Sequence, residues 1–268
     1  MKSAAHDSRN VRDYILSLAA AGRYHFASAE VRRALGVSAD AAKLAVNRLA
    51  KQRLVASPAR GFYVIVPPEY RALGCLPAEQ FIPALMNRLK LPYYAGLLTA
   101  AQYHGAAHQR PQEFQVVVES TRRPIVCGAV RVSFIRRARA SKVPVQNINT
   151  PRGELLVSTP EATALDLVGY EARVGGLDQV ATILSELAER IDAQKLAEAA
   201  DTAPLPWAQR LGYLLELAGA AERTAPLKAY VSEHAKQWTA LAPGSPRAQA
   251  ARREDWKLHV NAEVETEL

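Results

Sequence analysis

The chain has 268 residues, of which 49 % are hydrophobic and 22 % are charged, a composition typical of folded proteins large enough for two domains. It contains no run of about 18 uncharged apolar residues, so we expect no membrane span. Charged residues close to the N-terminus argue against a signal peptide, and two cysteines outside any CxxC pattern argue against a disulfide framework. We therefore expect a cytoplasmic protein.

Positive charge is concentrated in the first half of the sequence. Residues 1–68 contain 11 Lys and Arg against 4 Asp and Glu, a net charge of +7, and residues 69–140 contain 10 against 4, a net charge of +6. The other segments are mildly acidic, with net charges of −4 over residues 141–200 and −1 over residues 201–268. A protein that is merely basic throughout would show an even spread. The asymmetry predicts a nucleic-acid surface in the first half and a different task in the second.

The chain begins with two predicted helices. Apolar residues at helical spacing predict the first helix over residues 8–22, with Ser8 as its N-cap and Gly22 in the left-handed position at its end. The second helix is expected over residues 28–36, with Ser28 as its N-cap.

A third helix and a β-hairpin follow. The helix is capped by Ser38 or Asp40 and has its apolar residues on one side. A strand is expected from Leu54, then a turn over residues 57–61 and a returning strand over residues 62–66.

Three helices followed by a two-stranded hairpin are typical of the winged helix-turn-helix, in which the third helix enters the major groove of DNA and the hairpin contacts phosphate. We therefore predict such a DNA-binding domain over residues 1–68. The polar side of the third helix offers Asn for adenine, Arg for guanine and Leu for the thymine methyl group. The predicted DNA-binding residues are Arg32, Arg33, Ser38, Asp40, Lys43, Leu44, Asn47, Arg48, Lys51, Arg53 and Arg60. The alternative is a small helical module with a solvated face, or a winged helix used for protein contacts.

Residues 69–268 predict a larger α+β domain, with helices, then a β-rich block, then helices again. The first helices are expected over residues 76–90 and 91–105. The β-rich block covers residues 112–159 and is followed by helical segments. Near the end, residues 256–265 predict a further strand.

No stretch supports a catalytic, metal or cofactor site. His104 and His108 have the spacing of zinc ligands on a helix, but the glutamate of HExxH is absent, which favours structural or surface histidines. Asp166 lies in an apolar stretch and is interpreted as a satisfied buried carboxylate. Glu119 ends a predicted strand without the lysine that a nuclease would need nearby. Walker, GxGxxG and GxSxG motifs are absent, and we predict a protein that is not an enzyme.

Arginines within residues 69–140 leave two interpretations open. They could form a second nucleic-acid surface on the larger domain, or a solvated strand edge where positive charge discourages aggregation. The arginines concerned include Arg122, Arg123, Arg136, Arg137 and Arg139.

Five segments of the larger domain resemble, in sequence and in order, the AbiEi family of antitoxins. They are LPYYAGLLTAAQYHGAAHQRPQEFQVV, STPEATALDLV, GGLDQVATILSELAE, QRLGYLLELAG and WKLHVNAEVE. An N-terminal winged helix precedes the corresponding segments in that family, as it does here, so the resemblance covers nearly the whole chain.

The resemblance implies a two-part role in a type IV toxin–antitoxin system of phage abortive infection. The winged helix would bind inverted repeats in the promoter of its own operon and repress transcription. The C-terminal domain would counter a separate AbiEii toxin, which resembles a nucleotidyltransferase, without requiring a stable complex. Two alternatives remain, a winged-helix regulator whose α+β domain senses a small molecule, and a DNA-targeted nuclease that uses Glu119.

Overall fold

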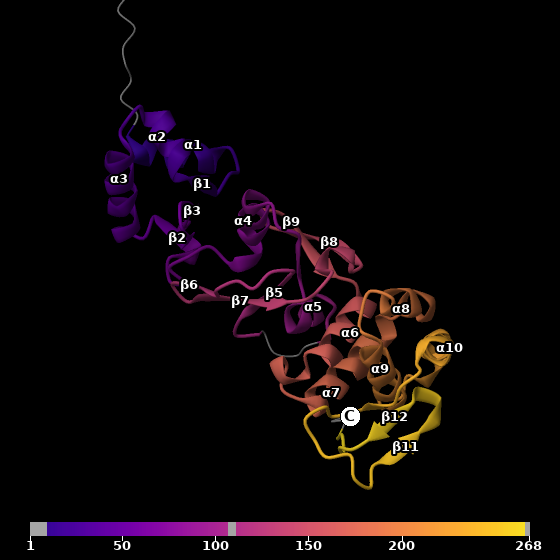
Figure 1. The fold of residues 1–268 in the computed structure, drawn as a ribbon. Coiled ribbons are helices and arrows are strands. Elements are labelled where there is room, and N and C mark those ends of the chain that lie inside the picture. Colours follow the sequence, from indigo (N-terminus) through magenta and orange to yellow (C-terminus); the bar gives the residue numbers. More distant parts are fainter. Residues whose placement is uncertain (1–9, 107–110, 266–268) are drawn as a thin grey trace, which may run out of the picture. The chain divides into compact units, whose positions relative to one another are not determined.

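A computed structural model describes residues 10–106 and 111–265 (Figure 1). These residues form a mixed α+β structure with ten α-helices and three sheets. The predicted α+β class is therefore confirmed. Among the described residues, no helix is both long and apolar enough to cross a bilayer.

The first helix, α1 (Val11–Ala20), begins two residues later than predicted. Its N-cap is Asn10, whose side-chain oxygen accepts hydrogen bonds from the backbone N–H groups of Arg12 and Asp13. Ser8, the predicted cap, lies outside the described residues. Gly22 does adopt the left-handed conformation expected after the helix end.

The second and third helices are α2 (Ser28–Leu35) and α3 (Ala39–Lys51). Ser28 is the first helical residue of α2 rather than its predicted cap, because the Glu30 carboxylate already accepts the N–H of Ala27, 2.6 Å away. The cap predicted for α3 is confirmed, since the Ser38 hydroxyl accepts the N–H of Ala41.

A three-stranded antiparallel sheet completes this part, in the order β1-β3-β2. The strands are β1 (His25–Ala27), β2 (Val55–Ala59) and β3 (Phe62–Ile65). The turn is shorter than predicted, because β2 continues through Ser57 and Pro58 and only Arg60 and Gly61 remain between the strands. Three helices with a small antiparallel sheet are the arrangement expected of a winged helix.

Two short 3-10 turns, Pro68–Tyr70 and Ala78–Gln80, lead to α4 (Ile82–Leu89). The helix predicted over residues 91–105 is wrong in its first part, which forms β4 (Tyr93–Ala95) before α5 (Leu97–Tyr103) begins. Gly96 divides the two elements: a Cβ there would lie 2.6 Å from a Val117 methyl carbon.

The β-rich block forms most of a six-stranded sheet with the order β6-β7-β5-β4-β9-β8. Strand β4 pairs antiparallel with β5 and parallel with β9, so it is buried between two neighbours. The strands not yet named are β5 (Phe114–Val118), β6 (Ile125–Cys127), β7 (Val130–Arg136), β8 (Val145–Thr150) and β9 (Gly153–Ser158).

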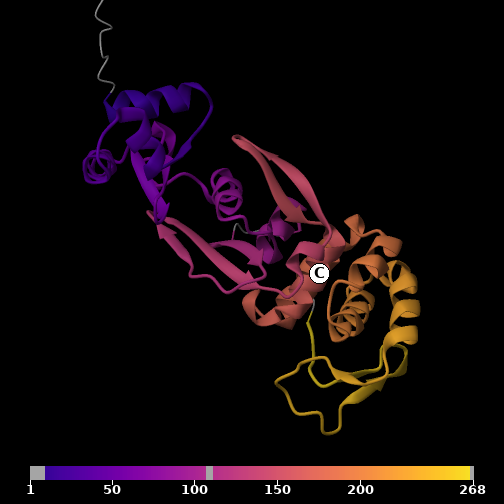
Figure 2. The ribbon, with the colours of Figure 1, turned by 45° about the horizontal axis from the view of Figure 1, so that its top comes forward.

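Five helices follow and pack against one another around a large apolar core (Figures 1 and 2). They are α6 (Pro160–Gly169), α7 (Leu177–Leu187), α8 (Ala193–Ala200), α9 (Leu205–Leu217) and α10 (Ala225–His234). A small sheet with the order β10-β12-β11 ends the structure and contains the predicted last strand. Its strands are β10 (Thr239–Ala240), β11 (Ala251–Arg253) and β12 (Leu258–Val260).

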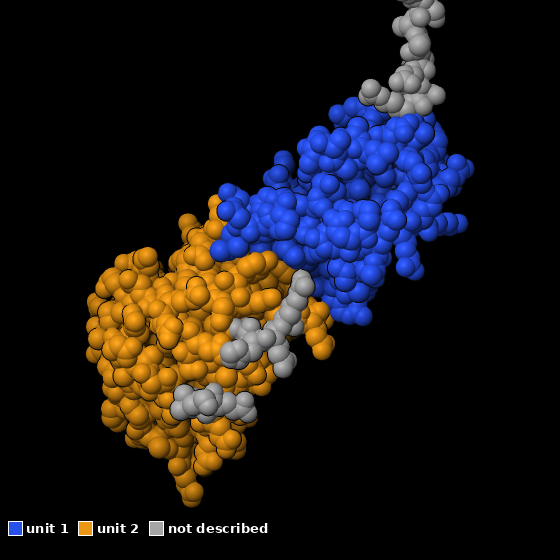
Figure 3. Space-filling model, turned by 180° about the vertical axis from the view of Figure 1, so that it is seen from behind, with its two compact units in different colours: residues 1–92, 121–134, 148–155 blue, residues 93–120, 135–147, 156–268 orange. Residues whose placement is uncertain are grey.

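The chain divides into two compact units (Figure 3). Unit 1 comprises residues 1–92, 121–134 and 148–155, and unit 2 comprises residues 93–120, 135–147 and 156–268. The β8–β9 turn belongs to unit 1 because the Arg152 guanidinium lies 3.3 Å from the ring centroid of Tyr24 and donates a hydrogen bond to Gln80. The domain boundary predicted between residues 68 and 69 stays a prediction.

Candidate nucleic-acid interface

The orientation of α3 follows from its apolar stripe. Ala42, Val46 and Leu49 are buried in the core of the winged helix, which they share with Ile15 of α1 and Phe26 of β1. Because an α-helix has 3.6 residues per turn, the residues between them face away from that core. The exposed face of α3, as we name it, consists of Asp40, Lys43, Leu44, Asn47, Arg48 and Lys51.

All eleven residues predicted to bind DNA are exposed in the structure. Leu44 is the most unusual of them, because a large aliphatic side chain on α3 is 59 % exposed. Single exposed leucines are common, so this one alone is weak evidence. On a helix that also presents Asn47 and Arg48, it supplies the apolar group that a thymine methyl would contact.

A pocket of about 430 Å³ brings four of the predicted residues together. It lies between the beginning of α2, the beginning of α3 and the β2–β3 turn. Its basic side chains are Arg32 of α2, Lys43 of α3 and Arg60 of the β2–β3 turn, and its carboxylate is that of Asp40. Three cations converging on one hollow form a site suited to a phosphate group.

The remaining predicted residues lie outside this pocket. Ser38 is occupied in capping α3, and Arg53 follows the helix in a left-handed backbone conformation, with φ of 57°. Arg33, Arg48 and Lys51 do not line the pocket.

The basic side chains of this surface have no ion-pair partner among the described residues. Within residues 10–106 and 111–265, none of the predicted DNA-binding Lys or Arg side chains forms an ion pair, whereas Arg23 nearby pairs with Glu30. Unpaired surface cations are common, but here they share one surface with few carboxylates. The arrangement favours an anionic partner.

One cation of this surface was not predicted from the sequence. Arg88 of α4 reaches the β2–β3 turn, since a Cβ built on Gly61 would lie 3.7 Å from Arg88 Nη2 and 3.5 Å from Ser28 Oγ. No local sequence signal marks Arg88, because its position depends on how α4 packs against the winged helix within unit 1.

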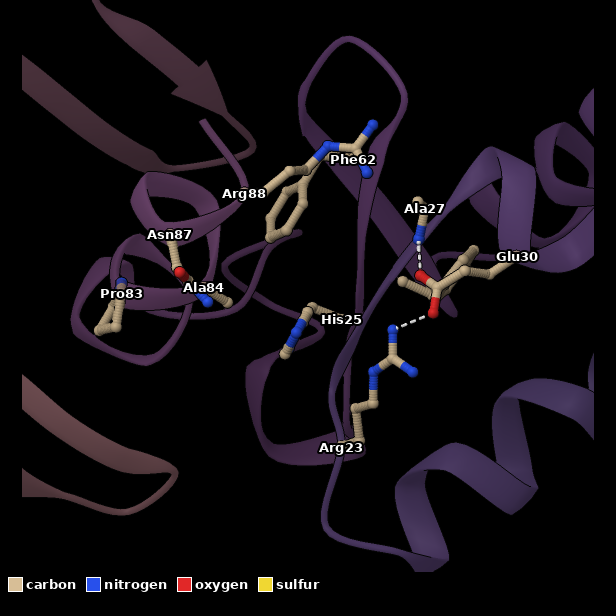
Figure 4. Close-up of a pocket in the computed structure, with 10 residues that line it drawn as sticks. Arg23, His25, Ala27, Glu30, Phe62, Pro83, Ala84, Asn87 and Arg88 are labelled. Carbon is tan, nitrogen blue, oxygen red and sulfur yellow. Dashed lines mark hydrogen bonds and ion pairs between the residues drawn. The ribbon is translucent and has the colours of Figure 1, made fainter. Parts of the chain in front are cut away.

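A second pocket, of about 480 Å³, is lined by Arg88 and lies between β1, β3 and α4 (Figure 4). The stacked rings of His25 and Phe62 form part of its wall, and the ion pair between Arg23 and Glu30 lines it as well. Burial lowers the pKa of His25, which favours the neutral form of the imidazole.

Arg137, one of the arginines proposed for a second basic surface, is buried instead. Its Nη1 atom lies 2.9 Å from Asp166 Oδ1 and donates a hydrogen bond to the Tyr94 hydroxyl, which in turn donates to Asp166 Oδ2. The guanidinium also lies 5.4 Å from the ring centroid of Trp207. Asp166 is completely buried and is paired with Arg137 and Tyr94, which confirms its interpretation as a satisfied core carboxylate.

The other arginines of that group differ in exposure. Arg123, Arg136 and Arg139 are exposed, while Arg122 is half-buried with its guanidinium 5.6 Å from the ring centroid of Phe134. A second nucleic-acid surface and a solvated strand edge therefore both remain open as interpretations of these arginines, with Arg137 removed from the group.

The residues considered for catalysis have structural partners. The His104 ring is buried, with Nε2 2.8 Å from the carbonyl oxygen of Ser158, and His108 lies outside the described residues. The Glu119 carboxylate accepts hydrogen bonds from the backbone N–H and the hydroxyl of Ser141, which lower the pKa of Glu119.

Comparisons with known proteins agree with the resemblance. The crystal structure of the Rv2827c protein from Mycobacterium tuberculosis is similar, with a TM-score of 0.64 and 16 % sequence identity over 91 % of this chain and 89 % of that one, which shows a shared fold. A comparison with curated proteins found no match. The family model described as "AbiEi antitoxin C-terminal domain" matches residues 94–217. Residues 94–217 of this chain are therefore similar to the C-terminal domain of the AbiEi antitoxin family.

Proposed function

We propose that this protein is a DNA-binding antitoxin that represses its own operon through the winged helix. The observation that carries the proposal is the exposed face of α3 together with the pocket formed by Arg32, Lys43 and Arg60. The face holds side chains that can contact base edges, and the pocket holds cations for the backbone beside them.

In the proposed complex, α3 lies in the major groove. Asn47 pairs with adenine, Arg48 with guanine, and Leu44 contacts a thymine methyl group. The β2–β3 turn brings Arg60 to a phosphate, and the second turn of α3 brings Lys43 to the same strand. An inverted repeat in the promoter would take two copies of the chain, one on each half-site.

The second part of the proposal concerns the C-terminal domain. The similarity to the AbiEi antitoxin family implies a cognate AbiEii toxin, and we propose that residues 69–268 counter such a nucleotidyltransferase-like toxin in the cytoplasm. We propose no enzymatic step and no cofactor for this role, and no stable complex with the toxin is required.

Protection of the chain's own promoter from cleavage tests the DNA-binding part. The triple variant Lys43→Ala, Asn47→Ala, Lys51→Ala should lose its specific footprint, because it removes two charges and one base-contacting amide from the exposed face of α3. The matched control is Lys142→Ala, Lys195→Ala, which removes the same charge from exposed positions of the larger domain. An unchanged footprint for the triple variant, or an equal loss for the control, would refute the assignment.

A winged-helix regulator that senses a small molecule is the second candidate. The pocket in Figure 4 favours it, because Arg88 and Asn87 offer polar groups beside the His25 and Phe62 rings. Such a regulator would release the promoter when the ligand binds, and Asn87→Ala should prevent that release. Rescue of cells from a co-expressed toxin by the 69–268 fragment would favour the antitoxin instead.

A further inference from the structure

The two cysteines of the chain lie side by side in unit 1, although 51 residues separate them in the sequence. Cys75 lies between the two short 3-10 turns that follow the winged helix, and Cys127 is the last residue of β6. Their neighbours are in backbone contact, since the N–H of Ala129 donates a 2.7 Å hydrogen bond to the carbonyl oxygen of Leu73.

Two glycines permit this close approach. Gly74 and Gly128 both have left-handed backbones, with φ of 67° and 60°. A Cβ on Gly128 would lie 2.0 Å from the carbonyl oxygen of Leu73, which no side chain could tolerate. The segments that carry the two cysteines are therefore held together by the backbone itself, and both thiols are buried between them.

The two thiols differ in their surroundings. Cys75 is completely buried and Cys127 is 8 % exposed, at the start of the turn between β6 and β7. The side chains hydrogen-bond to each other, which raises the pKa of Cys75 and lowers the pKa of Cys127. Cys75 is therefore the donor, and Cys127 is the side chain that ionises first and is nearer to solvent.

We propose that Cys75 and Cys127 form a reversible thiol–disulfide modification site whose oxidant is a hydroperoxide. The Cys127 thiolate attacks the peroxide oxygen, the O–O bond breaks, and the products are Cys127 sulfenic acid and an alcohol or water after proton uptake. The Cys75 sulfur then attacks the sulfenic sulfur. An S–S bond forms, the S–O bond breaks, and hydroxide leaves with the Cys75 proton as water. Two thiols are oxidised and one peroxide is reduced.

The site is connected to the wing of the winged helix. The backbone N–H of Ser57 in β2 hydrogen-bonds to Cys127, where it lowers the pKa of the thiol. The Ser57 hydroxyl donates to the carbonyl oxygens of Ala59 and Phe62, on the two sides of the β2–β3 turn. Oxidation replaces the ionisable Cys127 thiol by a disulfide sulfur that carries no charge, so it changes the acceptor of the hydrogen bond from Ser57. The oxidation of the two cysteines does not depend on the proposed binding of DNA.

Intact mass spectrometry of the folded full chain, treated with hydrogen peroxide, tests the proposal. The wild type should lose two hydrogen atoms and regain them with dithiothreitol. Cys75→Ser should stop at a sulfenic acid in the peptide that contains Cys127, trapped as a dimedone adduct, because no second thiol is present. Cys127→Ser should show neither product. In ¹⁵N-labelled wild type, the amide signal of Ser57 should move on oxidation and return on reduction.

Two results would overturn the proposal. The first is a disulfide that forms only in denaturant and not in the folded chain, which would show that the thiols are inert in their native surroundings. The second is dimedone labelling of Cys75 in the Cys127→Ser variant at the rate seen for Cys127, which would contradict the assigned roles. A disulfide that leaves the Ser57 amide unchanged would overturn the connection to the wing.

Discussion

The exposed face of α3 and the cluster around Arg137 use the same kinds of side chain in opposite ways. On α3, Lys43 and Lys51 are exposed and have no ion-pair partner among the described residues. In unit 2, Arg137 is 2 % exposed and has a carboxylate, a hydroxyl and an indole ring around it. Local sequence does not separate them, since both lie in basic stretches.

The buried Arg137 and the exposed Lys43 differ in the free energy that the folded protein loses when their surroundings change. A buried cation that loses its carboxylate partner still carries the full cost of desolvation, so the stability of the fold depends on the pairing of Arg137. A surface cation costs the free protein little to keep or remove, so Lys43 matters only when a partner is bound. Removing a charge should therefore affect stability in the Arg137 cluster of unit 2 and affinity on the exposed face of α3.

The largest effect is expected from Asp166→Ala. Removing the carboxylate leaves Arg137 buried and charged, which should lower the free energy of unfolding by about 3–5 kcal/mol. Urea denaturation measures this change. The matched control is Arg136→Ala, because Arg136 is adjacent but exposed and its loss should cost at most about 0.5 kcal/mol. Equal effects for the two variants would remove the distinction between paired and unpaired arginines.

The pH dependence of stability sharpens the same point. Burial raises the pKa of Asp166 from 3.8 to about 6, with Arg137 and Tyr94 opposing the increase. Between these values the folded chain holds a proton that the unfolded chain releases, so the contribution of this carboxyl to stability falls as pH rises through that window. The difference in unfolding free energy between wild type and Asp166→Asn should follow this fall from pH 4 to pH 6. A flat difference would show that the carboxyl titrates normally.

A smaller stability effect is expected at the beginning of α3. Ser38→Ala removes the hydroxyl that accepts the Ala41 N–H, and should cost about 1 kcal/mol. Ser38→Asp keeps a capping oxygen and should retain the stability of the wild type, as followed by thermal unfolding. If both variants were equally destabilised, capping would not be the role of Ser38.

The smallest effect is expected at the β2–β3 turn. Arg60→Ala should leave stability unchanged and weaken binding to all duplex sequences similarly, with the slope of log affinity against log salt falling by at most about one unit. Anisotropy titrations at several salt concentrations measure this slope. A large change in sequence preference would show that Arg60 contacts bases rather than phosphate.

Much of the winged helix was predictable because its signals are local. The Ser38 cap, the left-handed Gly22 and the apolar stripe of α3 each depend on residues within one or two turns. The strands β1 and β4 were missed for the opposite reason. Three-residue strands carry no usable period, and Tyr93–Ala95 is a strand only because β5 and β9 flank it.

The sequence predicts which residues belong to the candidate DNA-binding surface, but not which of them lie next to one another. The sequence identifies Arg32, Lys43 and Arg60 as cations of the winged helix, and their convergence on one pocket requires the fold. Arg88 could not be predicted, because it comes from α4. Arg137 was misassigned to a surface because its partners, Tyr94 and Asp166, are distant in the sequence.

The central claim is that the exposed face of α3 binds duplex DNA. The affinity of the full chain for a labelled duplex from its own promoter, compared with a scrambled duplex at the same salt concentration, tests it most directly. The account predicts tighter binding to the promoter duplex and a steep loss of affinity for both duplexes as salt rises. No binding to either duplex in dilute buffer would contradict it.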